Sequence, residues 1–294
     1  MHRLQLTGFD MASLIQSVSR AGNRLGRLWS RQYRSWTADR RCLPDFIIIG
    51  AQKSGTTSLF HYLAQHPQLK ASWRKEVHFF DGGLSPRRDN HARGEHWYRS
   101  NFPLVDDMTA GDQAFEASPL YLFHPLAPAR MAELLPDVRL IAVLRHPVER
   151  ALSHYFHEVR KGRETLPVME ALEREEDRLA LLLEKQDYSH PVFTHFSYKS
   201  RGHYAQQIRR YHEYFPPENL LVLGSEAFFG DPHAALARIF DFVGVDPVTV
   251  PNLVPRNVGS NRTRVEAPVY DYLESYFRPL NRELYALLGT DFGW

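Results

Sequence analysis

Short apolar runs alternate with amphipathic stretches along the chain after residue 44. The runs at 46–49, 138–144 and 220–223 are rich in β-prone residues and have the length of strands covered on both faces. A helical pattern follows the first run and ends near His66, before Pro67. Further helices are predicted over 126–135, 147–162, 166–185, 204–215 and 232–243. This alternation predicts an α/β fold with a central parallel sheet and helices on both faces.

Two regions differ from this alternation. Residues 1–43 precede the first strand and are predicted to form a basic N-terminal appendage to a main domain at 44–294. The stretch from Pro67 to about Pro119 is predicted to be rich in loops and contains several aromatic residues. A long irregular segment inside a compact domain is usually functional. We therefore expect this stretch to shape a binding site.

Composition excludes several classes of protein. The 294 residues carry a net charge of only +2, which gives no case for a nucleic-acid partner. The single cysteine, Cys42, excludes an intramolecular disulfide and a cysteine-rich zinc site. No apolar run of about 18 residues and no secretory apolar segment occurs, so neither a transmembrane anchor nor a signal peptide is expected. We expect a soluble, cytoplasmic protein.

Arginines and apolar residues are interleaved at helical spacing over residues 14–36. A basic amphipathic helix of this kind can lie on an anionic membrane, which would make the protein peripheral to the bilayer. The alternative is a solvated basic arm or a helix that packs on the domain. The sequence favours this second interpretation.

The loop after the first strand has the composition of a phosphate cradle. Gly50 and Gly55 allow tight turns, Lys53 supplies a charge, and the residues Ser54, Thr56, Thr57 and Ser58 supply hydroxyl groups at the start of a helix. The N–H groups and the dipole of a helix N-terminus attract anions. In a Walker A loop, G-x-x-x-x-G-K-[ST], the lysine follows the second glycine, whereas here it precedes that glycine. The fold is thus predicted to be of the P-loop type, with an altered phosphate loop.

A second anion site is predicted at the end of the strand at 138–144. Arg145 stands at its carboxyl end, and Ser153 lies on the following helix. A guanidinium can hold a phosphate by paired hydrogen bonds, and a serine hydroxyl can add one more. Ligands of parallel sheets bind beyond the carboxyl ends of the strands, so Arg145 and Lys53 are expected in one crevice. Two phosphate sites indicate a doubly phosphorylated nucleotide.

The segment Lys75-Glu76-Val77-His78-Phe79-Phe80-Asp81 is the candidate for proton transfer. If it is extended, Glu76, His78 and Phe80 lie on one side and Val77 and Phe79 on the other. A carboxylate among aromatic rings is partly desolvated, and its pKa can rise toward neutral pH, as a general base requires. His78 is a candidate to contact the acceptor or to orient Glu76. The alternative for Glu76 is an exposed acid paired with Lys75 or Arg74.

Histidines give no convincing metal site. His154 and His157 are three residues apart on a predicted helix, and His146 is near in sequence, but no third ligand has suitable spacing. No metal is expected.

Together these motifs resemble the sulfotransferases that use 3′-phosphoadenosine 5′-phosphosulfate (PAPS), in particular the branch of heparan sulfate N- and O-sulfotransferases. The resemblance covers most of the chain after residue 44. It lies in the loop at 50–57, the segment at 145–153 and the glutamate segment at 76–81. Further matches are Trp97-Tyr98, Phe115-Glu116-Ala117-Ser118-Pro119 with Tyr121, Arg201-Gly202-His203-Tyr204 and Pro279-Leu280-Asn281.

The resemblance implies in-line transfer of a sulfuryl group from PAPS to a hydroxyl or amine, most simply on a saccharide or glycolipid. Lys53 would bind the 5′-phosphosulfate, and residues 54–58 would hold the 5′-phosphate. Arg145 and Ser153 would bind the 3′-phosphate, and Glu76 would be the base. Arg262 is the candidate for the basic C-terminal loop that closes over the 3′-phosphate, although the Lys-Gly-Arg loop of such relatives is missing.

Two other functions remain as alternatives. A P-loop nucleotide kinase or hydrolase is disfavoured by the position of Lys53 and by the lack of an evident Walker B acid. The second alternative is a non-enzymatic nucleotide-binding protein, which the basic N-terminal segment supports.

Overall fold

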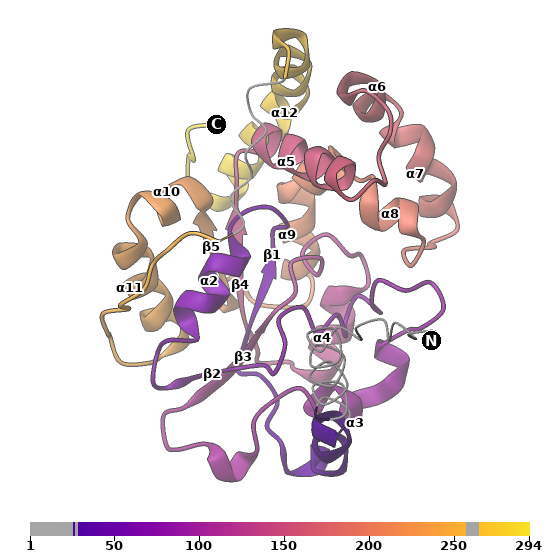
Figure 1. Cartoon of the computed structure of the whole chain (residues 1–294). Coiled ribbons are helices and arrows are strands. Elements are labelled where there is room, and N and C mark those ends of the chain that lie inside the picture. Colours follow the sequence, from indigo (N-terminus) through magenta and orange to yellow (C-terminus); the bar gives the residue numbers. More distant parts are fainter. Residues whose placement is uncertain (1–25, 27–28, 257–264) are drawn as a thin grey trace, which may run out of the picture.

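The computed structural model describes residues 26, 29–256 and 265–294, and it contains one parallel five-stranded sheet (Figure 1). The strands lie in the order β2-β3-β1-β4-β5. Their bounds are Phe46–Gly50 for β1, Leu69–Ala71 for β2, Gln113–Ala117 for β3, Arg139–Leu144 for β4 and Leu220–Gly224 for β5. The predicted parallel α/β fold is confirmed.

Helices connect the strands. They are α2 (Thr56–Leu63), α3 (Gly94–Arg99), α4 (Ala127–Leu134), α5 (Pro147–Arg160), α6 (Val168–Glu173), α7 (Glu175–Glu184), α8 (Pro191–His195), α9 (Tyr204–His212), α10 (Ser225–Gly230), α11 (Pro232–Val243) and α12 (Ala267–Leu288). The predicted helices correspond to α2, α4, α5, α9 and α11. The helical pattern predicted over 166–185 is divided into α6 and α7 at Arg174.

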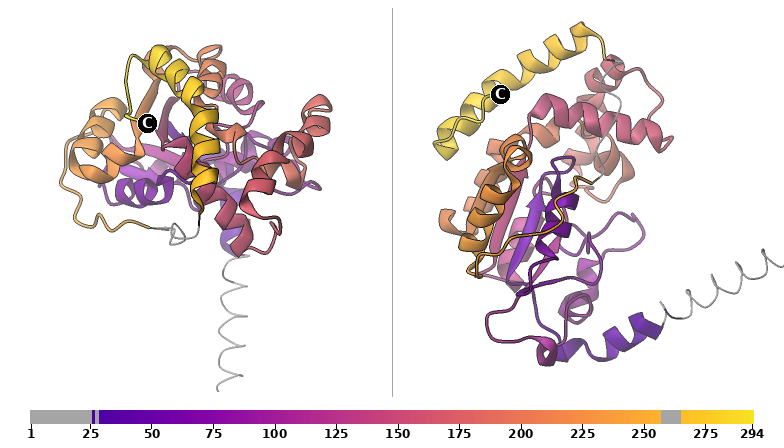
Figure 2. Two further views of the ribbon diagram at one scale, coloured as in Figure 1. Left: turned by 90° about the horizontal axis from the view of Figure 1, so that it is seen from above. Right: turned by 60° about the vertical axis from the view of Figure 1, so that its left-hand side comes forward.

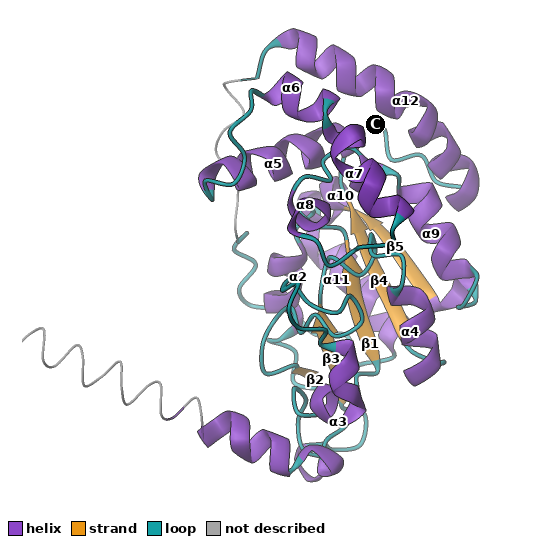
Figure 3. Cartoon of the chain, turned by 90° about the vertical axis from the view of Figure 1, so that its right-hand side faces the viewer, coloured by secondary structure: helices purple, strands orange, loops and turns teal. Residues whose placement is uncertain are grey.

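Alternate residues of the sheet enter two separate cores. Ile47 and Leu140 face a core to which α4, α9 and α12 contribute. Phe46 and Ile141 face the opposite core, which α2 and α11 complete. Figure 3 shows the sheet between these helices. Side chains of successive strand residues point to opposite faces of the sheet. Strands that are apolar throughout are therefore strands that are buried on both faces.

The long helix α12 runs across α5 and α9 (Figure 2). Val269, Leu273 and Phe277 pack in a third core with Val148 and Leu152 of α5. The sequence prediction lacked this helix because Pro279 lies inside it, and proline normally interrupts a helix. Burial of one face of the helix, from Val269 to Leu284, outweighs that local penalty.

The prediction of a loop-rich stretch up to Pro119 was partly wrong, because the stretch contains β2, β3 and α3. Strand β3 has the sequence Gln-Ala-Phe-Glu-Ala, whose acidic residue obscures a buried strand. Glu116 is fully buried there, and its role is described below.

The described end of the N-terminal segment packs on the domain. Residues 29–36 are helical, and Arg34 donates hydrogen bonds to Ser100 O and Phe102 O, both at 2.7 Å. Arg41 also donates to Phe102 O at 2.7 Å. The interpretation of a helix that packs on the domain therefore holds for this part, and the boundary at residue 43 stays a prediction. No helix among the described residues is long and apolar enough to cross a membrane.

Candidate active site

The phosphate loop lies at the point where the direction of strand connection reverses. The chain runs from β1 to β2 and β3 on one side, and then crosses to β4 on the other. Open α/β sheets bind ligands at such switch points, beyond the carboxyl ends of the strands. Figure 1 shows α5 passing over this end of the sheet.

The loop is shaped to receive an oxyanion. Gly55 caps α2 with a φ of 97°, and a Cβ atom there would lie 2.7 Å from the ring of Phe229. The Ser54 hydroxyl is buried and has no hydrogen-bond partner in the structure. A buried unpaired hydroxyl is costly, and a phosphate oxygen would supply the missing partner. The loop therefore fits the phosphate group that its sequence predicts.

One cleft of about 570 Å³ unites the predicted motifs. Its lining includes Lys53, Ser54, Gly55, Thr56 and Thr57 from the loop, together with Glu76, Arg145 and Ser153. The cleft extends beyond the phosphate loop, because it reaches from α2 across α5 to the start of α12. Residues from segments that are far apart in the sequence thus line the same cleft.

Arg145 links the two predicted anion sites. Its Nη1 donates to Lys53 O at 3.1 Å, and its Nη2 lies 3.2 Å from Glu149 Oε2. Burial lowers the pKa of Lys53, and the neighbouring Arg160 and Arg145 lower it further. The prediction that Lys53 and Arg145 share one crevice is confirmed, and the mutual repulsion of these cations favours an anionic ligand.

Helix α5 presents one face to this cleft. Glu149, Ser153, Phe156, His157 and Arg160 all line it. Positions three and four apart lie on the same side of a helix, which explains why these five residues face the same space. Sequence reasoning identified only Ser153 among them, although the helical spacing from Ser153 could have indicated His157 and Arg160.

The loop and the glutamate segment contain residues in the left-handed backbone region. Lys53, Glu76 and His78 have φ values of 72°, 64° and 55°. Such a conformation costs about 1–3 kcal/mol for a residue other than glycine and concentrates at functional sites. The three residues predicted to be catalytic therefore coincide with three strained positions. Gln186 is the only other non-glycine residue with positive φ in the part of the chain that the structure describes.

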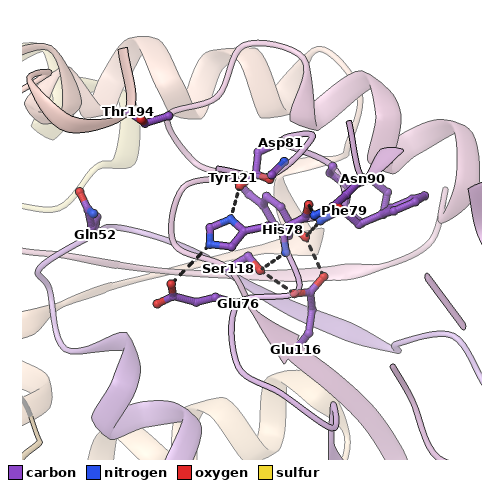
Figure 4. A network of polar contacts seen from close by, with 12 residues as sticks. Gln52, Glu76, His78, Phe79, Asp81, Asn90, Glu116, Ser118, Tyr121 and Thr194 are labelled. Carbon is purple, nitrogen blue, oxygen red and sulfur yellow. Dashed lines mark hydrogen bonds and ion pairs between the residues drawn. The ribbon is translucent and has the colours of Figure 1, made fainter. Parts of the chain in front are cut away.

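Glu76 and His78 lie side by side, as the sequence predicts (Figure 4). His78 Nδ1 lies 2.6 Å from Asp81 Oδ2, and His78 Nε2 lies 3.4 Å from Glu76 Oε2. Burial lowers the pKa of His78, but the two carboxylates outweigh burial and raise it to about 10. His78 is thus an imidazolium ion at neutral pH, fixed between two acids.

Two details of this segment differ from the prediction. Burial raises the pKa of Glu76, but His78 and Lys75 outweigh it and lower the value to about 2, opposite to the expected direction. Lys75 Nζ lies 2.7 Å from Glu76 Oε1. Phe80 does not lie beside Glu76 and His78 but is fully buried against Tyr98 and Tyr121. The left-handed residues turn the backbone, so the alternation of an extended strand is lost.

Beneath this segment, Glu116 organises a network of hydroxyl groups. It accepts hydrogen bonds from Tyr98 and Ser118 at 2.7 Å and from Tyr121 at 3.0 Å. Ser118 Oγ in turn accepts from His78 N at 3.2 Å, and Tyr121 Oη accepts from Phe79 N at 2.8 Å. Burial raises the pKa of Glu116 to about 7, although the three hydroxyls lower it. An acid inside an apolar strand was the sequence signal for this role.

Not every predicted residue lies in the cleft. Ser58 is fully buried, does not line it, and accepts a hydrogen bond from Arg256 N at 2.9 Å. Arg262 lies outside the described residues, whereas Arg256 lines the cleft and was missed.

The described residues contain no group of three or more histidine, cysteine, aspartate or glutamate side chains able to hold a metal ion. His154 is fully buried, whereas His157 lines the cleft.

Comparisons with known proteins identify the family of the chain. Residues 43–256 match the family model of the sulfotransferase domain. Heparan sulfate glucosamine 3-O-sulfotransferase 6 from Mus musculus is 31% identical over 281 residues, which cover 87% of this chain and 75% of that protein. The membrane-associated sulfotransferase kil1 from Dictyostelium discoideum is 26% identical, with 86% and 67% covered.

A solved structure extends the similarity to three dimensions. The sulfotransferase from Alicyclobacillus acidocaldarius is 33% identical and superposes with a TM-score of 0.70, covering 85% of this chain and 98% of that one. The comparisons do not favour the kinase alternative. The chain therefore belongs to the sulfotransferase domain family and is a sulfotransferase.

Proposed function

We propose that the protein transfers the sulfuryl group of PAPS to a hydroxyl or amine of a carbohydrate acceptor. The observation that carries this proposal is the single cleft that contains the phosphate loop, Arg145, Ser153 and Glu76. The loop would hold the 5′-phosphosulfate, with Ser54, Thr56 and Thr57 as donors. Arg145 and Ser153 would hold the 3′-phosphate, which ATP lacks. Arg256 and Arg160 are further cations that line the same cleft.

The reaction is a direct displacement at sulfur. The acceptor oxygen or nitrogen forms a bond to sulfur, while the bond from sulfur to the bridging oxygen breaks and its electron pair stays with adenosine 3′,5′-bisphosphate. The acceptor proton passes to the Glu76 carboxylate. Lys53 stabilises the charge that develops on the bridging oxygen. The scheme needs no metal, because cationic side chains and a helix N-terminus neutralise the donor.

The environment of Glu76 suits this role in one respect and limits it in another. A pKa of about 2 keeps the carboxylate ionised at neutral pH and ready to accept a proton. The same low pKa makes it a weak base toward a free hydroxyl. The proton therefore leaves as the bond to sulfur forms, when the hydroxyl has become strongly acidic. His78 would position Glu76 through their ion pair.

The acceptor class follows from the relatives. The mouse relative is named for a heparan sulfate glucosamine substrate, which supports a saccharide or glycolipid acceptor here. The resemblance to both N- and O-sulfotransferases leaves the choice between amine and hydroxyl to experiment.

A cytoplasmic location and peripheral membrane contact through residues 14–36 remain predictions. Trp29 and Trp36 are 68% and 69% exposed on the described part of that segment, and amphipathic aromatic rings favour membrane interfaces. The Dictyostelium relative is named a membrane-associated sulfotransferase, which supports contact of this protein with a membrane.

Thermal unfolding with nucleotides tests the donor. Adenosine 3′,5′-bisphosphate at 100 times its dissociation constant should stabilise the protein by about 2.7 kcal/mol, and ADP or ATP at the same concentration should stabilise it much less. Stabilisation by ATP with magnesium, and none by the bisphosphate, would instead support a kinase or hydrolase. Equal, weak effects of all three nucleotides would contradict the assignment of PAPS as the donor.

A further inference from the structure

Arg201 is a buried cation that contacts the phosphate loop. It belongs to the 3-10 helix η4 (Ser200–Gly202), between α8 and α9. Its Nη1 donates a hydrogen bond to Gln52 Oε1 at 2.5 Å. Its Nε donates to Ser197 Oγ and its Nη2 to Thr194 O, both at 2.7 Å. Arg201 therefore ties the side chain of Gln52 to α8 and to the residues that follow α8.

The turn that carries Arg201 is itself held by buried polar side chains. Glu175 of α7 accepts hydrogen bonds from Lys199 N and, at 2.8 Å, from Ser200 N. Gln207 of α9 donates through its Nε2 to Arg201 O at 3.1 Å. The side chains of Glu175 and Gln207 are both buried. Arg201 is therefore fixed before a ligand binds, and such preorganisation lowers the entropic cost of binding.

Arg201 keeps its charge in spite of burial. All three of its hydrogen-bond acceptors are neutral oxygens. Burial and the charge of Arg150 lower the pKa of Arg201 to about 9, although Glu158 and Glu175 raise it. Arg201 is therefore a cation at neutral pH. A buried cation whose hydrogen bonds reach only neutral groups is costly, and an anionic ligand nearby offsets part of that cost.

The contact with Arg201 determines the orientation of the Gln52 amide. A guanidinium only donates hydrogen bonds, so the amide oxygen of Gln52 faces Arg201 and the amide NH2 group points away from it. In Figure 4 the Gln52 side chain points to the side on which Thr194 lies. Gln52 lines the cleft, whereas Arg201 does not. No residue that the structure describes accepts a hydrogen bond from Gln52 Nε2. This nitrogen is therefore available to a ligand in the cleft.

The proposed reaction fixes where the sulfuryl group lies relative to Gln52. Lys53, Glu76 and Gln52 all line the cleft. Lys53 is assigned to the leaving oxygen and Glu76 to the attacking group, so an in-line displacement puts the sulfur atom between them. Gln52 directly precedes Lys53, and their Cα atoms are therefore about 3.8 Å apart. The oxygens of a sulfuryl group share a negative charge, which makes them strong acceptors for the Gln52 amide.

We propose that Gln52 Nε2 donates a hydrogen bond to an oxygen of the transferred sulfuryl group, and that Arg201 is the positioning residue that orients the Gln52 amide. The inference rests on the proposed function, since it adds a contact to the same donor. The contact distinguishes PAPS from adenosine 3′,5′-bisphosphate, because the bisphosphate lacks the sulfuryl group.

The acceptor is the competing partner for the Gln52 amide, because the acceptor also enters the cleft. A contact with the acceptor would leave the binding of both nucleotides unchanged. A purely structural role, in which Gln52 only completes the hydrogen bonds of Arg201, would affect both nucleotides alike. PAPS and the bisphosphate differ only in the sulfuryl group. The ratio of their affinities therefore isolates the proposed contact.

Calorimetric titration of the full chain with PAPS and with the bisphosphate, in the absence of an acceptor, measures this ratio. Gln52→Met keeps the size of the side chain and removes the amide. Gln52→Glu keeps an oxygen that accepts from Arg201 but has no N–H group to donate. Gln206→Met is the control, because it makes the same change at an exposed position of α9 that does not line the cleft.

We expect Gln52→Met to bind PAPS about tenfold more weakly than the parent, because a hydrogen bond to a charged acceptor is lost. Its affinity for the bisphosphate should stay within about twofold of the parent value. Gln52→Glu should lower the affinity ratio at least as far, since a carboxylate repels the sulfuryl group. The control should keep the ratio of the parent. An unchanged ratio in either Gln52 variant would overturn the proposal.

A double-variant cycle tests the role of Arg201. Arg201→Met should lower the affinity ratio, because the Gln52 amide loses its orientation. Addition of Gln52→Met should then lower the ratio by less than about twofold more, since coupled residues do not act additively. Independent effects of the two substitutions would overturn the assignment of Arg201. The same cycle with Arg201→Lys, which keeps the charge but not the planar fork, covers the case in which Arg201→Met does not fold.

Failure of the proposed function gives a different result. A parent protein that binds neither PAPS nor the bisphosphate would refute that function. A parent that binds both nucleotides, with the same affinity ratio in the Gln52 variants, would refute only the contact of Gln52. Bisphosphate affinities equal to that of the parent verify that the variants are folded.

Discussion

His78 Nδ1 lies 2.6 Å from Asp81 Oδ2, and the Asp81 side chain is fully buried. This ion pair orients the imidazole ring so that its other nitrogen, Nε2, lies 3.4 Å from Glu76 Oε2. The buried aspartate thereby acts on the proposed base through histidine. The three charges alternate in sign along Asp81, His78 and Glu76. Substitution of the buried Asp81 should therefore change the pKa of His78.

Replacement of Asp81 tests its effect on the pKa of His78. Asp81→Asn should lower the pKa of His78 from about 10, because its largest source of stabilisation is lost. A histidine with a raised pKa adds stability that is complete below its unfolded pKa of about 6.5 and is lost as pH rises through the folded value. The parent should therefore lose more stability than the variant between pH 6.5 and about 10.

Urea unfolding of both proteins at several pH values, together with the NMR titration of His78, checks this prediction. Parallel stability curves over that range would mean that the pair contributes nothing to folding.

Glu116 gives a second prediction about pH. Its pKa of about 7 lies above the unfolded value of about 4.3, so ionisation destabilises the folded state as pH rises through this interval. Glu116→Gln keeps an acceptor oxygen for the hydroxyl network but cannot ionise. The free energy of unfolding of the variant, relative to the parent, should therefore rise from pH 4.5 to pH 7. A constant difference between the two proteins would contradict a raised pKa at Glu116.

Arg145 is predicted to determine the preference for a 3′-phosphate. Arg145→Ala should lose most of the ratio between the affinities for adenosine 3′,5′-bisphosphate and for AMP, because a charged hydrogen-bonding partner disappears. Ser153→Ala, which removes one neutral hydroxyl, should reduce the same ratio by a smaller factor. Calorimetric titration of the three proteins with both nucleotides measures the ratio. An unchanged ratio in Arg145→Ala would place the 3′-phosphate elsewhere.

The geometry of the phosphate loop predicts that any side chain at position 55 destabilises the protein. Gly55→Ala should destabilise the protein by roughly 1–3 kcal/mol, because alanine is strained at a φ of 97° and its Cβ would meet Phe229 at 2.7 Å. The double variant with Phe229→Ala removes the steric contact but not the backbone strain. The double variant should therefore recover only part of the bisphosphate binding that Gly55→Ala loses. Full binding in the single variant would show that the loop does not require glycine.

Sequence reasoning predicted the sheet and the site where local patterns were uniform. The apolar run at Ile47 and the loop at Lys53 needed no knowledge of distant residues, since strand, turn and helix follow each other directly. Strand β3 was missed because its buried Glu116 depends on hydroxyls that only the folded chain brings together. Helix α12 was missed because its stability comes from packing on α5 and α9.

The charges in the site were the least predictable property. Aromatic neighbours indicated a raised pKa for Glu76, but His78 and Lys75 reverse the direction. The left-handed backbone at Glu76 and His78 brings their side chains together in a way that strand periodicity does not describe. Likewise, Arg160 and Arg256 enter the cleft from surfaces whose sequences resemble ordinary basic helices and loops.

The most direct test of the account is transfer of radiolabelled sulfate from PAPS to a panel of glycans by the parent and by Glu76→Gln. The variant should bind adenosine 3′,5′-bisphosphate as tightly as the parent, because the proposal assigns Glu76 to the acceptor and not to the nucleotide. Its turnover should fall by about 10²- to 10⁴-fold, the usual effect of removing a general base. Equal turnover of the two proteins would contradict the assignment of Glu76 as the base.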